Sequence, residues 1–336
     1  MINTPHTLSV VAPARLLAID AHAEIERIAR CVGEQVRHDL RRKAVVIGLS
    51  GGVDSSVCAA LCVNALGPER VIGLLMPERE GSPDSVGLAR QLGEHLRIRT
   101  IVEDITGPLE AAGCYRRRDT AIRTLVPEYG DAHRCMLSVT RVMDGRASVF
   151  ALVVESPDGT RQRHRLNAEV YLAVVAATNF KQRVRKMFEY HYADLHQAAV
   201  VGTPNLLEYD QGFFVKNGDG SADLKPIAHL YKSQVYELAE ALDVPEAIRR
   251  RSPTTDTYPL AQSQEEFFFA LPWSVLDVCL YGYNSGFDAA AVAPFAGLAP
   301  EDVAIVYRDI EAKRAAARYL HEPPLLAGPI RSASHR

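Results

Sequence analysis

The stretch Gly48-Leu49-Ser50-Gly51-Gly52-Val53-Asp54-Ser55 decides the fold. An apolar run at 44–47 precedes it, and a helix-like segment at 55–66 follows it. This order predicts a strand, a tight glycine turn and a helix whose unpaired N–H groups point back at the turn. Such a helix start binds anions through its free amides and its dipole. Gly51 and Gly52 lack the Cβ atoms that would keep a phosphate away from the backbone.

Polar side chains in this glycine loop (48–55) add to the predicted phosphate site. Ser50 and Ser55 supply hydroxyl donors, whereas the carboxylate of Asp54 would repel a phosphate. A divalent cation between the two removes that repulsion, because Mg²⁺ is commonly held by one carboxylate together with phosphate oxygens. The loop therefore predicts a site for a magnesium nucleotide.

Two common phosphate loops do not fit this pattern. No Gly-Lys-Ser/Thr follows, so it is not a Walker A loop, and the third glycine of the dinucleotide fingerprint is missing. The pattern resembles the pyrophosphate loop of the N-type ATP pyrophosphatases. That resemblance implies cleavage of ATP between its α and β phosphates and activation of an acceptor as its adenylate. An ordinary glycine turn is the alternative, and the strand–turn–helix context disfavours it.

Composition limits the class of protein. Lys and Arg number 38 and Asp and Glu 41, so no net basic charge favours nucleic acid as a partner. The six cysteines form no Cys-x-x-Cys pair, which argues against a zinc ribbon or a disulfide framework. There is no signal-peptide pattern and no apolar run of membrane-spanning length. We expect a cytoplasmic protein without a membrane partner.

The order of segments predicts an α/β fold with a doubly wound parallel sheet. Strands and helices alternate through the first hundred residues, as in Rossmann-like, adenine nucleotide alpha hydrolase-like folds. The expected elements are a helix at 20–41, a strand at 71–75, a helix at 84–95, a strand at 98–102, a strand at 200–202 and a helix at 231–242. We expect one domain over residues 1–336, with an insertion at about 116–168 and a helical C-terminal part (273–281, 300–320).

The insertion interrupts the alternation. A strand-like run at 148–154, a turn at 156–159 and an alternating run at 160–166 predict a β-hairpin. The basic cluster 115–118 (Tyr-Arg-Arg-Arg) is interpreted as a solvated face. A single helix is expected from Asn167 to Leu195.

Later motifs suggest which acceptor is activated. The motifs are Asn179-x-x-x-Arg183-x-Arg185, Gly202-Thr203-x-Asn205-x-x-Glu208, Gly212-Phe213-Phe214-x-Lys216-x-Gly218-Asp219-Gly220-x-Ala222-Asp223, Leu230-Tyr231-Lys232-x-Gln234-Val235 and Pro253-Thr254-x-Asp256. In order and spacing these motifs resemble those of ammonia-dependent NAD synthetase. The resemblance covers about residues 20–115 and 168–282. The insertion departs from the family pattern. So does the C-terminus, where eight residues separate the basic pair 313–314 from the proline pair 323–324.

The resemblance implies roles for these residues at the ATP end. ATP would be bound by all eight residues of the glycine loop and by Thr203, Lys232 and Thr254, and Mg²⁺ by Asp54 and Glu208. Lys232 would also be catalytic, because its charge relieves the repulsion between an attacking carboxylate and the α-phosphate and stabilises the departing pyrophosphate.

At the acceptor end, the resemblance implies that deamido-NAD is held across a homodimer interface. The residues concerned are Arg183, Lys216 and Asp223. Asp219 would be the second catalytic residue. Ammonium must lose a proton before it attacks the adenylate, and a nearby carboxylate can take up that proton.

Three functions remain open on the sequence. The first is an amide ligase that converts deamido-NAD, ATP and ammonia into NAD, AMP and pyrophosphate, with free ammonia or ammonia from a partner. The second is the same chemistry on a different carboxylic acid. The third is an ATP-binding regulator without turnover, which Asp54, Glu208 and Lys232 argue against, because binding alone does not need the full set.

Overall fold

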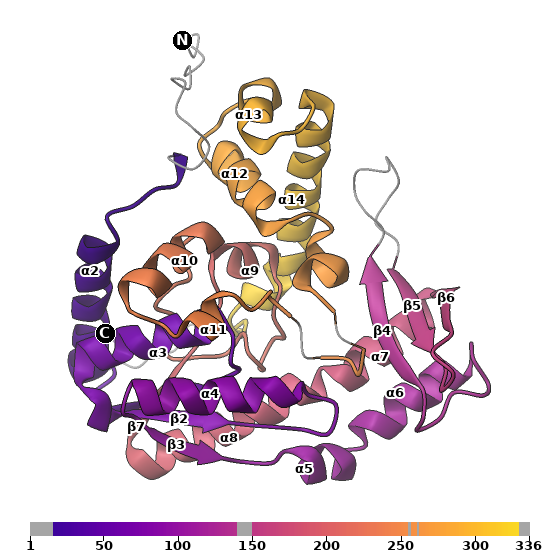
Figure 1. Cartoon of the computed structure of the whole chain (residues 1–336), viewed down its shortest axis with the longest axis horizontal. Helices are drawn as coiled ribbons and strands as arrows, with labels where there is room; N and C mark the ends of the chain where they lie inside the picture. The colour runs from indigo at the N-terminus through magenta and orange to yellow at the C-terminus, as the bar shows by residue number, and fades with distance from the viewer. Residues whose placement is uncertain (1–15, 140–149, 255–256, 261, 329–336) are drawn as a thin grey trace.

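The computed structural model describes residues 16–139, 150–254, 257–260 and 262–328. Its centre is a four-stranded, entirely parallel sheet with the strand order β3-β2-β1-β7 (Figure 1). The strands are β1 (Ala44–Gly48), β2 (Val71–Leu75), β3 (Arg99–Val102) and β7 (Ala198–Val201). Helices connect them, so the predicted α/β fold with a doubly wound parallel sheet is confirmed.

Helices cover both faces of this sheet. Because successive side chains of a strand point to opposite faces, Val45 and Ile47 pack into one core and Val46 into the other. The first core contains side chains from α2 (Ala21–Glu34), the π-helical turn η1 (Gln35–Asp39), α3 (Val53–Leu66), α4 (Pro83–His95), α10 (Lys232–Ala241) and α11 (Glu246–Arg249). The second lies under α8 (Phe180–His196). A short 3₁₀ turn, η2 (Pro68–Arg70), leads into β2.

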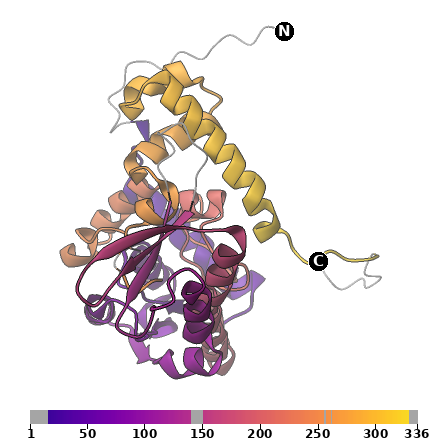
Figure 2. The ribbon, with the colours of Figure 1, turned by 90° about the vertical axis from the view of Figure 1, so that its right-hand side faces the viewer.

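The predicted hairpin is confirmed as β5 (Phe150–Glu155) and β6 (Arg161–Arg165). A third strand, β4 (Arg134–Val139), was not predicted and pairs with β5 in an antiparallel sheet. This sheet lies at one side of the molecule and faces the viewer in Figure 2. It shares a core with α6 (Cys114–Arg123) and α7 (Ala168–Thr178), while α5 (Thr106–Ala111) precedes α6. Positions 148 and 149 of the predicted strand, and Asp256 of the last motif, lie outside the described residues.

The single helix predicted from Asn167 to Leu195 is wrong. The structure has two helices, α7 and α8, which meet at Asn179. Asn179 keeps helical dihedral angles (φ −61°, ψ −16°), so residue periodicity does not reveal where the first helix ends and the second begins. The physical reason is tertiary: α7 packs on the antiparallel sheet, whereas α8 packs on the parallel one.

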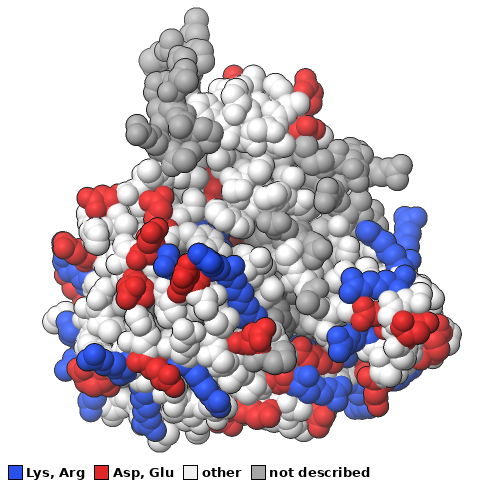
Figure 3. Space-filling model, in the orientation of Figure 1, with Lys and Arg blue, Asp and Glu red and all other residues white. Residues whose placement is uncertain are grey.

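The C-terminal part is helical, as predicted. It comprises η4 (Glu265–Phe269), α12 (Trp273–Asn284), α13 (Ala289–Ala296) and α14 (Pro300–His321), which share a core with α9 (Leu206–Gln211). In the described part of the chain no single helix is long and apolar enough to cross a bilayer; only α13 and α14 taken together have that length and composition, and they are bent by 103°. On the face drawn in Figure 3, acidic and basic side chains are largely interspersed.

Candidate active site

A cavity of about 830 Å³ opens at the carboxyl ends of β1 and β2. Ligands of doubly wound sheets bind at this edge, because the loops that follow the strands converge there. Walls come from the glycine loop, the segment after β2, the start of α8, the loop after β7 and the start of α10. The insertion adds Phe150, and α7 adds Tyr171, whose rings stack at 4.6 Å.

The glycine loop has the predicted geometry. Gly52 is the N-cap of α3, and no side chain caps this helix. Gly51 has a φ of +74°, in the left-handed region that favours glycine. The hydroxyl oxygens of Ser50 and Ser55 lie 3.1 Å apart, and the Ser55 hydroxyl donates to the carbonyl of Gly52 at 3.1 Å. The loop is therefore held open at the start of α3, in a shape suited to phosphates.

Gly51→Ala should weaken nucleotide binding. A Cβ at this position would lie 2.7 Å from the carbonyl oxygen of Ser85, and the left-handed backbone adds about 1–2 kcal/mol of strain. We expect the Kd of a non-hydrolysable ATP analogue, measured by calorimetry, to rise at least about tenfold. The matched control is Gly87→Ala, where no atom lies within 4 Å of the added Cβ. Equal affinity in both variants would contradict the assignment.

Three charged side chains from three helices meet beside the glycine loop. Asp54 lies in the first turn of α3, Glu208 in α9 and Lys232 at the first position of α10. The Lys232 ammonium donates to Oδ2 of Asp54, and the amide of Asn205 donates to Oδ1 at 3.0 Å. Glu208 closes a capping box with Asn205 and accepts from Nε2 of Gln264 at 2.9 Å. These contacts hold both carboxylates and the ammonium in one place.

Burial makes this cluster electrostatically strained. Burial, and then the charge of Asp54, raises the pKa of Glu208 to about 7, and Lys232 only partly offsets this. Burial by itself would lower the pKa of Lys232, but the negative charges of Asp54 and Glu208 raise it by more. The pKa of Lys232 is therefore raised overall, and the side chain stays an ammonium. Two carboxylates thus share one buried cation, which leaves a negative excess when both are ionised.

The donor set of Asp54 and Glu208 fits Mg²⁺. Mg²⁺ prefers hard oxygen ligands and commonly takes one or two protein carboxylates, with phosphates and water supplying the rest. Within the described ranges no group of three or more His, Cys, Asp or Glu side chains could hold a metal by itself. The arrangement therefore suits a cation that arrives with a nucleotide.

Two of the three residues predicted to bind the acceptor, and the predicted base Asp219, lie at the same cavity. Asp219, Lys216 and Arg183 all line it. Burial raises the pKa of Asp219, although its Oδ1 accepts from the Val215 amide at 2.7 Å. The Lys216 ammonium donates to the carbonyls of Tyr319 and Glu322 at the end of α14, each at 2.7 Å. The C-terminal helix thus contributes to this side of the cavity.

Two of the predicted site residues do not line the cavity. Thr203, Thr254 and most of the glycine loop line the cavity, but Gly51 and Asp223 do not. Gly51 supplies the left-handed backbone turn of the loop. Asp223 accepts from the Val200 amide at 2.8 Å beside β7. Within this one chain the structure does not bring Asp223 to the cavity.

The interpretation of the cluster 115–118 as a solvated face is wrong for half of its members. Arg116 and Arg117 are exposed, but Tyr115 and Arg118 are each only 3% exposed. Residues three apart share a helix face, and on α6 this face turns inward. Glu78, which also lines the cavity, was not predicted. Its position just after β2 was the available signal, since loops at the carboxyl ends of strands form such sites.

Comparisons with known proteins agree on one family. The family model described as NAD synthase matches residues 24–125 and 156–314, so the unmatched stretch lies inside the predicted insertion. A protein of Mesorhizobium japonicum named NH(3)-dependent NAD(+) synthetase is 54% identical over 313 residues, which cover 93% of this chain and 98% of the relative. One of the same name from Thermotoga maritima is 36% identical over 217 residues, 65% of this chain and 72% of the relative.

Solved structures share the fold. An NMN synthetase from Francisella tularensis is 21% identical with a TM-score of 0.62, and the match covers 92% of this chain and 99% of that one. An NH3-dependent NAD synthetase from Campylobacter jejuni is 21% identical with a TM-score of 0.61, covering 93% and 100%. At this identity the likeness establishes the architecture alone.

Proposed function

The chain belongs to the NAD synthase family, and from this membership we propose that it joins ammonia to deamido-NAD at the expense of ATP, forming NAD, AMP and pyrophosphate. The family predicted from the motifs is thereby confirmed. The observation that carries the proposed chemistry is the meeting of Asp54, Glu208 and Lys232 beside the glycine loop. In the proposed complex, the ammonium and the two carboxylates of this cluster lie next to the phosphates of ATP.

In the proposed first step, the nicotinate carboxylate attacks the α-phosphate and pyrophosphate leaves. The free amides at the start of α3 receive the phosphates. Lys232 places a desolvated ammonium beside the charge that develops on the departing pyrophosphate. Asp54 and Glu208 would hold Mg²⁺, which supplies further positive charge to the phosphates when bound.

In the proposed second step, ammonia displaces AMP. Ammonium gives a proton to the carboxylate of Asp219, the nitrogen attacks the acyl carbon of the adenylate, and the bond from that carbon to the phosphate oxygen breaks. The second proton lost by the nitrogen leaves on the phosphate of AMP. Burial raises the pKa of Asp219, so this pKa lies closer to neutral pH than the pKa of an exposed aspartate does. Arg183 and Lys216 hold the acceptor at the same cavity.

The proposal extends to assembly and location. A homodimer accounts for Asp223, which lies outside the cavity of its own chain and would serve deamido-NAD across the interface between two copies. We assign residues 1–336 to one domain built around the cavity and place the protein in the cytoplasm.

The test measures AMP and NAD together. The purified protein is incubated with ATP, Mg²⁺, ammonium and deamido-NAD, and we expect the two products in equal amounts. Parallel reactions contain nicotinate mononucleotide or other carboxylic acids. If AMP forms only with one of these other acids, that acid is the acceptor. If no AMP forms with any acid, the protein is an ATP-binding regulator without turnover. Formation of ADP and orthophosphate would contradict the proposed cleavage.

Arg183→Ala should mainly raise the KM for deamido-NAD. The guanidinium is exposed at the cavity, and a hydrogen bond to a charged group contributes about 1.5–3 kcal/mol, so the loss corresponds to at least about tenfold in KM. The kcat should change little, because this contact is the same before and during the reaction. Arg117→Ala, an exposed arginine outside the cavity, is the control. Unchanged kinetics would remove Arg183 from the site.

A further inference from the structure

The segment after β2, residues 76–82, forms one wall of the cavity. Met76, Pro77, Glu78, Gly81 and Ser82 line it, next to the glycine loop. The segment has no regular secondary structure, so side-chain contacts must define its shape. Two glutamates within it supply those contacts.

Glu78 and Glu80 both form salt bridges with Lys181, a lysine of α8. The Lys181 ammonium donates to Oε1 of Glu78 and Oε2 of Glu80, each at 2.7 Å, and to the carbonyl of Thr257 at 2.9 Å. All three of its donors are therefore used. Lys181 is only 1% exposed, and Tyr115 donates to the second oxygen of Glu78 at 2.7 Å.

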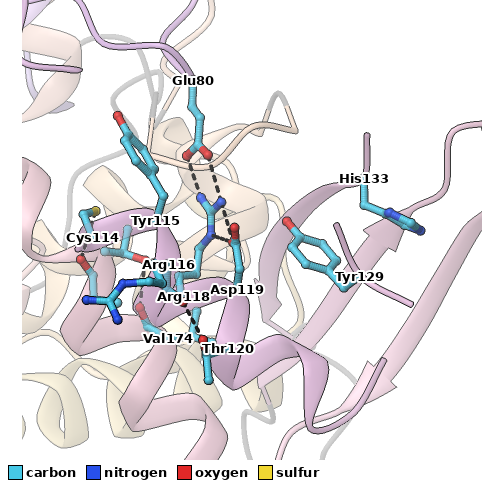
Figure 4. A network of polar contacts seen from close by, with 12 residues as sticks. Glu80, Cys114, Tyr115, Arg116, Arg118, Asp119, Thr120, Tyr129, His133 and Val174 are labelled. Atoms are coloured by element: carbon cyan, nitrogen blue, oxygen red, sulfur yellow. Dashed lines mark hydrogen bonds and ion pairs between the residues drawn. The ribbon is translucent and has the colours of Figure 1, made fainter. Parts of the chain in front are cut away.

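Arg118, from α6, also binds Glu80. Its guanidinium donates to both carboxylate oxygens, at 2.5 and 2.8 Å, and its Nε donates to Asp119 at 2.9 Å. Figure 4 shows this Arg118 guanidinium between the carboxylates of Glu80 and Asp119. Burial raises the pKa of Glu80, but Arg118 and Lys181 outweigh it and the net shift is downward, so the group is a carboxylate at neutral pH.

Such a buried cluster fixes geometry more than it stabilises the fold. Each ion loses its hydration, and only contacts of good geometry offset that loss. The arrangement of the segment 76–82 is thereby restricted to the one that satisfies both glutamates. Ile122, further along α6, packs in the core of the antiparallel sheet, so the insertion supports the arginine that binds this segment.

We propose that Arg118 and Lys181 are positioning residues for nucleotide binding, which hold the segment 76–82 in shape through Glu80 and Glu78. Neither cation lines the cavity, but two of the residues bound to Lys181, Glu78 and Thr257, do. The inference rests on the proposed function for the identity of the nucleotide, ATP. It gives the insertion a role in shaping the cavity.

The test compares Arg118→Met, Glu80→Gln and the double variant. Arg118→Met takes a partner from Glu80 and Asp119, and Glu80→Gln takes one from Arg118 and Lys181, so both should lower the unfolding temperature. The double variant removes both of these charges, and the unfolding temperature should recover in part, because Asp119 and Lys181 still lack one partner each. The two hydrogen bonds from Arg118 to the Glu80 carboxylate are missing in all three variants. The Kd of a non-hydrolysable ATP analogue should therefore stay raised at least about tenfold in each of them.

The control is the pair Arg161→Met with Glu155→Gln. These residues form an ion pair at 2.7 Å within the insertion and do not line the cavity. We expect the affinity for the analogue to match that of the unaltered protein. Calorimetry with the analogue does not depend on the acceptor, so failure to form NAD and failure of this inference are distinguishable. If the double variant regains affinity together with stability, the cluster serves only the fold and the proposal is overturned.

Discussion

Lys232→Ala is expected to reduce the release of pyrophosphate by at least about a thousandfold under all conditions. One preorganised donor to a developing negative charge is worth about 10²–10³ in kcat, and this ammonium also balances two buried carboxylates. Its removal leaves Asp54 and Glu208 without their nearest cation, so repulsion toward the phosphates increases. Pyrophosphate release at saturating ATP, Mg²⁺ and deamido-NAD measures the effect.

The matched control for this lysine is Lys313→Ala. Lys313 is also mostly buried and pairs with an aspartate, Asp309, at 2.8 Å, but it lies outside the cavity lining. Both variants lose an ion pair, so a loss confined to Lys232 separates chemistry from stability. Comparable rates in the two variants would show that Lys232 has no part in ATP cleavage.

Asp54→Asn is expected to lower NAD formation by at least about a hundredfold and to raise the Mg²⁺ concentration needed for half-maximal rate. The amide keeps the shape of the side chain but removes its charge. It also turns an NH₂ group toward a donor, because Asn205 and Lys232 each donate to one of the two oxygens. A titration of the rate with Mg²⁺ measures both effects.

Asp309→Asn provides the matched comparison for this carboxylate. Asp309 pairs with Lys313, and its side chain is 18% exposed against 17% for Asp54. We expect its Mg²⁺ dependence to equal that of the unaltered protein. If Asp54→Asn shows the same Mg²⁺ dependence as well, Asp54 is not a metal ligand.

Features encoded by neighbouring residues were predictable from the sequence. An apolar run, two glycines and a helix-like segment follow one another between 44 and 66, so the strand, the glycine turn and the helix could be predicted without any distant contact. The order of strands and helices gave the parallel pairing of β1, β2 and β3 for the same reason, because short crossovers leave few arrangements. The motifs beyond the loop supported the family only through resemblance.

Contacts between distant residues were decided by the tertiary structure. The bond from Lys232 to Asp54 spans 178 positions, and residue spacing cannot specify such a contact. Arg118 lies in a run of arginines that resembles a solvated face, yet it is buried because Glu80 offers it a partner across the fold. Asn179 keeps helical dihedral angles where α7 ends and α8 begins, and the two helices pack on different sheets. Local propensity determined the elements, whereas burial and pairing of charges determined which side chains reach the cavity.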